Sequence, residues 1–434
     1  MYEQKPARLF VHCALPQMAG LLVNSVYFIV DGVFIGHRLG SRAMAAAGAA
    51  VPLIEILIAL SLSLASGVGV VLSAALAQQR PREANRAFQS GLLLTALFGL
   101  LIALLGRVFL HPLCDLLGGR GEVHEPAAQY MDTILTLSPF LLFSFFLGGM
   151  ARNDQCPRLA MVALAAGSLS NIFLDWLFMY PLSMGIRGAA LATGIGPAVS
   201  VAILLPHFLR RGGRLRLGVS HARVSLFPRF LHLGFPSFIM EFTIGMIAFF
   251  VNYGIIQYGY GEEGLAAYLI VGYLSLIILT AFLGIAEGLQ PAFSCLWFAD
   301  RKGDARALAR FSSLIVLALG AAASLLSCLF SRAFYALFTP DDMPLRIFAA
   351  RVSRLYFPGF FAAGLNILAI SYCQSTARAG RSLLVSLLRA CVLPPLAILI
   401  LPRIDPSLLW LCHSLSEMVT LAAAAALKPP AKGA

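Results

Sequence analysis

Apolar stretches of about 20 residues recur along the whole chain, and they constrain its fold more than any other feature. A helix of that length crosses a hydrocarbon core of about 30 Å with every backbone group hydrogen-bonded. Only 12% of the 434 residues are charged, against roughly a quarter in a soluble protein. We therefore expect an all-α polytopic membrane protein with twelve spans, at 9–36, 46–77, 87–110, 127–150, 158–180, 188–209, 230–259, 265–298, 306–330, 346–373, 381–402 and 407–427.

The positive charge is unevenly distributed between the two sides of such a bundle. With the N-terminus in the cytoplasm, 21 of the 32 lysines and arginines fall on the cytoplasmic side and 10 outside. This bias follows the positive-inside rule, so the net charge of +12 does not require a nucleic acid partner. The sequence predicts an integral protein of a prokaryotic cytoplasmic (inner) membrane, in contact with lipid and with both termini cytoplasmic.

The two halves of the chain resemble each other. Pro16 corresponds to Pro236 at an offset of 220. The segment SGVGVVLSAALAQQRPREA (66–84) aligns with EGLQPAFSCLWFADRKGDA (287–305) at an offset of 221. Six spans per half give both repeats the same sense, so we expect two six-helix bundles related by a pseudo-twofold axis along the membrane normal. The predicted domains are residues 1–210 and 230–434, joined by a polar cytoplasmic linker at 211–229.

Polar side chains interrupt the spans on either side of residue 180. Asn171 and Asp175 are four residues apart, hence on one helix face, and Thr193 lies within the next span. A carboxylate, an amide and a hydroxyl inside a membrane are costly, and they indicate an ion or substrate site. A structural hydrogen bond between helices is the alternative.

Several segments, in order along the chain, resemble the multidrug and toxic compound extrusion (MATE) family. They are LPQMAGLLVNSVYFIVDGVFIG (15–36), GGMARNDQCPRLAM (148–161), NIFLDWLF (171–178), MGIRGAALATGIG (184–196), GFPSFIME (234–241) and GIAEGLQP (284–291). The likeness is to the DinF- and MepA-like branches. It implies a twelve-helix antiporter that exports bulky, often cationic, amphipathic compounds in exchange for Na⁺ or H⁺.

The resemblance also assigns residues. The cation site of DinF-like members matches Asp31, Asn171, Asp175 and Thr193, whose oxygens would be the Na⁺ ligands in a sodium-coupled protein. The same acids could instead carry a proton, and the sequence does not choose between the two ions.

Three residues of the second half are candidate substrate contacts. Glu241 matches the carboxylate of the seventh helix in the NorM-like branch. Glu287 stands where glutamine is usual, and it would either bind a cationic substrate or pair with an arginine. Asn252 is a mid-span amide that could bind substrate or a neighbouring helix.

Other functions lack their motifs. No Walker A sequence, HExxH or GxGD is present, so we expect neither ATP binding nor an intramembrane enzyme. The eight cysteines form no CxxC, and no cofactor beyond the coupling ion is expected. A flippase for a lipid-linked precursor is the alternative within transport, although its cavity would be cationic. We expect a monomer that acts on small organic molecules.

Overall fold

The computed structural model describes residues 5–117, 121–209, 214–218, 221–335 and 343–426, and these residues are almost wholly helical. The first half contains α1 (Pro6–Ala77), α2 (Pro81–Val108), α3 (Leu110–Leu116), η1 (Gly121–Val123), α4 (His124–Asn153), α5 (Pro157–Met179) and α6 (Ile186–Leu209). The second contains η2 (Val224–Leu226), α7 (Phe227–Gln257), α8 (Gly261–Phe298), α9 (Lys302–Tyr335), α10 (Met343–Tyr356), η3 (Phe357–Gly359), α11 (Phe360–Ser375), α12 (Ala379–Leu387), η4 (Leu388–Val392), α13 (Leu393–Ile400), η5 (Leu401–Arg403), η6 (Pro406–Leu411) and α14 (Cys412–Ala426).

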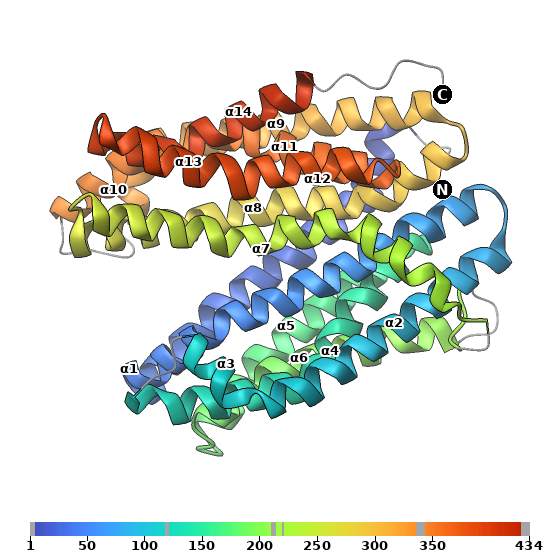
Figure 1. The fold of residues 1–434 in the computed structure, drawn as a ribbon, viewed down its shortest axis with the longest axis horizontal. Helices are drawn as coiled ribbons and strands as arrows, with labels where there is room; N and C mark the ends of the chain where they lie inside the picture. Colours follow the sequence, from blue (N-terminus) through green and yellow to red (C-terminus); the bar gives the residue numbers. More distant parts are fainter. Residues whose placement is uncertain (1–4, 118–120, 210–213, 219–220, 336–342, 427–434) are drawn as a thin grey trace.

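The helices form two bundles, α1–α6 and α7–α14, which approach each other at the end of the molecule where both chain termini lie and diverge toward the other end (Figure 1). We call these ends the terminal side and the distal side. Eleven helical stretches of the described chain are long and apolar enough to cross a membrane. The 31-residue α7 lies at the seventh expected span. The predicted fold class is confirmed, while the domain boundaries stay a prediction because 210–213 and 219–220 lie outside the description.

Helix α1 contains the first two expected spans, Pro6–Leu39 and Ala46–Ala77. It doubles back at the distal side (Figure 1). We predicted a break at 38–42, and the first span does end at Leu39 and the second begin at Ala46, although the backbone stays helical between them. The segment that follows is rich in alanine, the residue type with the highest helix propensity, and this favours a helical backbone after the bend.

Two other expected boundaries are partly described. Residues 118–120 of the predicted break at 118–122 lie outside the description, as do 339–342 of the break at 339–344. The tenth expected span is helical but contains a 3₁₀ turn at Phe357–Gly359, where Pro358 cannot donate a helical hydrogen bond.

The internal repeat is visible in the backbone. Gln79 and Asp300, 221 positions apart, both adopt a left-handed conformation, with φ of 55° and 59°. Each follows the last turn of a helix and lets the next residue hydrogen-bond back to close it. Arg80 and Glu83 form an ion pair at 3.6 Å, and their counterparts Arg301 and Asp304 form one at 2.7 Å. The predicted alignment of the halves is therefore confirmed at these positions.

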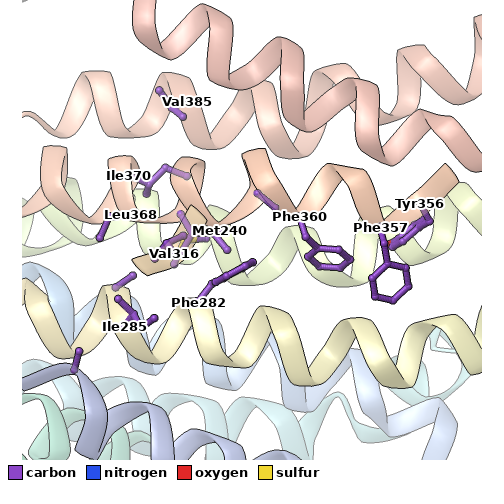
Figure 2. Close-up of a cluster of buried hydrophobic side chains, with 14 of the residues drawn as sticks. Met240, Phe282, Ile285, Val316, Tyr356, Phe357, Phe360, Leu368, Ile370 and Val385 are labelled. Atoms are coloured by element: carbon purple, nitrogen blue, oxygen red, sulfur yellow. The ribbon is translucent and has the colours of Figure 1, made fainter. Parts of the chain in front are cut away.

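Each bundle has its own apolar core. In the second bundle aromatic side chains of α8, α10, η3 and α11 converge, namely Phe282, Tyr356, Phe357 and Phe360 (Figure 2). From the first bundle, the start of α1 joins this cluster through Leu9, Phe10, Cys13 and Ala14. The two bundles are thus tightly packed against each other at the terminal side.

Candidate functional site

The first site lies inside the first bundle. Asp31 comes from α1, and Asp175 lies one helical turn after Asn171 on α5. The carboxyl groups of Asp31 and Asp175 are close enough to share a hydrogen bond when one holds a proton. Asp175 is fully buried and Asn171 is 2% exposed. The structure therefore brings together, from distant parts of the chain, the two acids that the sequence singled out.

These side chains have few hydrogen-bond donors around them. One oxygen of Asp31, both oxygens of Asp175 and both polar atoms of Asn171 find no hydrogen-bond partner among the described residues. Burying an ionised carboxylate that accepts no hydrogen bond costs on the order of several kcal/mol, because it loses its hydration without gaining a partner. A proton or a hard cation would remove that cost, and the orphaned oxygens are the ligand type that Na⁺ takes.

A cavity of about 630 Å³, part of it open to solvent, lies beside the acids and is lined by Asn171, Thr193, Asn24 and Ser168. The Thr193 hydroxyl donates to Ala189 O at 3.1 Å. The Tyr130 hydroxyl lies 3.5 Å from Thr193 Oγ1. Sequence reasoning missed Tyr130, which is 2% exposed on α4. A tyrosine facing the same side of its helix as buried polar neighbours is too common a pattern to mark a site by itself.

The second site lies between the bundles. A space of about 510 Å³, part of it open to solvent, is lined by residues of α1, α4, α7, α8 and α11, including Arg152, Ser237, Glu241, Glu287 and Gln374. Glu241 is 6% exposed, and its Oε1 has no hydrogen-bond partner among the described residues. One arginine and two acids thus line the space where the bundles meet.

Glu287 has partners in the opposite bundle. Gln17 Nε2 donates to Glu287 Oε2 at 2.8 Å, Arg152 Nη2 lies 3.6 Å from the same oxygen, and Arg152 Nη1 donates to Gln17 Oε1 at 3.0 Å. The arginine partner was one of the two alternatives for Glu287, but hydropathy could not say which arginine it is.

Asn252 is not brought to either site. It is exposed on α7, eleven residues and about 16 Å of helix rise beyond Glu241. Its role as a substrate contact stays a prediction.

A buried ion pair lies within the second bundle. Arg389 Nε donates to both oxygens of Glu417, at 2.8 and 3.1 Å, and Asn366 Nδ2 donates to Glu417 Oε2 at 2.8 Å. Arg389 sits in the π-helical turn η4, a local widening that often marks functional positions. The charge in the twelfth span is therefore compensated inside its own bundle.

Two helical bundles with buried acids and a charged space between them define the class: a polytopic integral membrane protein built as secondary transporters are. The MatE family model matches residues 16–177 and 236–399, more than half of the chain. The protein therefore belongs to the MatE family.

Curated relatives of similar sequence support this family assignment. Multidrug export protein MepA of Staphylococcus saprophyticus is 25% identical over 297 residues, 67% of this chain and 64% of that protein, so this match spans just under two thirds of the relative. MepA of Staphylococcus aureus strain bovine RF122 / ET3-1 is 22% identical over 401 residues, 91% of this chain and 87% of that protein. A solved multidrug resistance MATE family transporter of the MOP superfamily, described in an outward-facing conformation, superposes with a TM-score of 0.90. That chain is 21% identical, and the match covers 99% of this chain and 98% of the other.

Proposed function

We propose that this protein exports amphipathic, often cationic organic compounds by alternating access, in exchange for Na⁺ or H⁺. The observation that carries the proposal is the Asp31–Asp175 pair, whose orphaned, buried oxygens lack a positive partner among the described residues. A coupling ion bound there would compensate the charge in one conformation and leave when the site opens to water. Asn171 and Thr193 would complete its ligands. No other cofactor is needed.

The space between the bundles is the proposed substrate site. Among the described residues, one oxygen of Glu241 has no hydrogen-bond partner there, and Glu287 adds a second carboxylate. A cationic headgroup would be attracted to this lining, while an anionic lipid-linked precursor would be repelled by it. The flippase alternative is therefore not favoured.

The excess of lysine and arginine expected on the cytoplasmic side supports a cytoplasmic terminal side. We include this orientation in the proposal. The proposal also states that the protein lies in a prokaryotic cytoplasmic membrane, acts as a monomer and is not an enzyme. Export then requires the substrate to bind from the terminal side and leave at the distal side, where the bundles diverge in Figure 1.

The test is efflux of a cationic dye from proteoliposomes under an imposed Na⁺ gradient or an imposed pH gradient. Wild type should respond to one of the two gradients, and Asp175→Asn should lose the response. Asp304→Asn, which alters an exposed carboxylate on the terminal side, is the matched control and should transport normally. Full gradient-driven transport by Asp175→Asn would reject the coupling site. No transport by wild type under either gradient would reject the proposed antiport.

A further inference from the structure

Gln17, Arg152 and Glu287 form a polar cluster that joins the two bundles. Arg152 and Gln17 belong to the first bundle, on α4 and α1, and Glu287 belongs to α8 of the second. The side chains of Arg152 and Glu287 are 9% and 12% exposed, so the pair is largely shielded from water. Gln290, one turn after Glu287, also donates a hydrogen bond to Ser66 across the same interface.

The cluster lies where the bundles are closest. A Cβ on Gly288 would lie 2.5 Å from Cys13 O, and one on Gly284 would lie 2.5 Å from Met18 Cα. Arg152 is the penultimate residue of α4, near its terminal-side end. The contact between Arg152 and Glu287 therefore exists only while the bundles are together on the terminal side, because separating them there moves the two residues apart.

The same carboxylate faces the proposed substrate site. Glu287 and Arg152 both line the space between the bundles, with Glu241. The ion pair is loose: Arg152 approaches at 3.6 Å through one nitrogen, and Gln17 supplies the shorter bond. A bidentate arginine–carboxylate pair would be much harder to displace.

We propose that Arg152 competes with the cationic substrate for Glu287, and that this exchange helps to expel the substrate. With the terminal side open, Arg152 withdraws with the first bundle, and Glu287 binds the cation together with Glu241. When the terminal side closes, Arg152 returns to Glu287 and lowers the affinity for the cation, which leaves toward the distal side. The inference rests on the proposed function and supplies the difference in affinity between two states that transport requires.

A further cavity inside the first bundle lies next to this cluster. It has about 320 Å³ of space, part of it open to solvent, and its lining includes Gln17, Arg152, Ser144 and Ser200. Ser144 and Ser200 also line the cavity that Asn171 and Thr193 line. The two cavities therefore share lining residues, and a rearrangement around the coupling site would reach the surroundings of Arg152.

The test is the affinity of the purified full-length protein for a monovalent cationic dye, rhodamine 6G, measured by fluorescence anisotropy. Competition predicts changes of opposite sign: Arg152→Gln should tighten binding about tenfold, and Glu287→Gln should weaken it about tenfold. In the Glu287→Gln background, Arg152→Gln should have little further effect, because the contested carboxylate is gone. An uncharged dye, Nile red, should bind all variants alike.

Gln290→Ala is the matched control, since it removes a hydrogen bond between the bundles without removing a charge. If Arg152 and Glu287 only latch the bundles, both single variants should shift dye affinity in the same direction as Gln290→Ala, and the inference is wrong. Should Arg152→Gln fail to give folded protein, the exchange Arg152→Glu with Glu287→Arg restores the latch with the charges reversed. Competition then predicts weaker dye binding than wild type, and a latch predicts unchanged binding. Absence of rhodamine binding by wild type would overturn the proposed function, and this inference with it.

Discussion

Gly67 and Gly288 occupy equivalent positions in the two halves, and each lies against the backbone of the opposite bundle. A Cβ on Gly67 would collide with Phe230 O and lie 3.0 Å from Gly234 N. A Cβ on Gly288 would lie 2.8 Å from Ala14 Cα. Ala14 corresponds to Gly234 at the offset of 220 that relates Pro16 to Pro236, so the two contacts are copies of each other. The pseudo-twofold axis therefore passes between two close helix crossings, α1 with α7 and α1 with α8.

Substituting either glycine should force the bundles apart on the terminal side. Gly67→Ala and Gly288→Ala each add a methyl group where backbone atoms are already in contact, at a cost of about 1–3 kcal/mol. We expect a lower melting temperature in detergent for both. Gly303→Ala, whose Cβ would meet nothing within 4 Å, should melt like wild type. Unchanged melting of both interface variants would show that the crossings adjust without strain.

The buried acids of the first bundle should be required for coupled transport while lowering the stability of the fold. Asp175→Asn removes a fully buried carboxylate that lacks a donor among the described residues, so the variant should melt a few degrees higher while losing coupled transport. The measurement pairs thermal melting with proteoliposome efflux. A fall in melting temperature would indicate instead that the Asp31–Asp175 contact is mainly structural.

The ion pair of the second bundle should behave in the opposite way. Glu417→Gln leaves Arg389 with an uncompensated charge in a site where their side chains are 2% and 7% exposed. Loss of one partner of a buried pair typically costs about 3–5 kcal/mol, so we expect strong destabilisation in thermal melting. The double variant Arg389→Met with Glu417→Met should recover part of the loss, because it leaves no unpaired charge. Equal melting of the single and double variants would contradict this account.

The linker between the bundles should be held by α2. Gln89 Nε2 donates to Arg216 O at 3.3 Å, and Gln89 Oε1 accepts from His221 N at 3.0 Å. Gln89→Ala removes both bonds, and trypsin should then cleave faster after Arg216 and Arg223, as followed by mass spectrometry. Gln129→Ala, which removes a half-buried glutamine bonded to Glu125 in its own helix, is the control. Equal cleavage of Gln89→Ala and wild type would show that other contacts hold the linker.

Much of the architecture could be read from the sequence because its signals are local or periodic. Spans follow from apolar runs, and the end of α1 and the start of α2 follow from the polar break at 78–83. The repeat follows from matching residues at a constant offset. The pair Asn171 and Asp175 follows from helical spacing alone. The break expected at 38–42 separates the first two spans, but the sequence did not show that the backbone stays helical through the turn between them.

The tertiary structure alone decided which charges meet. Glu287 and Gln17 are 270 positions apart, and Arg389 and Glu417 are 28 apart on different helices. No periodicity within one helix encodes such pairs, since they depend on how helices cross and which face each presents. The sequence by itself therefore determined the membrane fold, its internal repeat and the acids that must be compensated. The packing of the two bundles decided the partners: Asp31 faces Asp175 within one bundle, and Glu287 meets Arg152 across both.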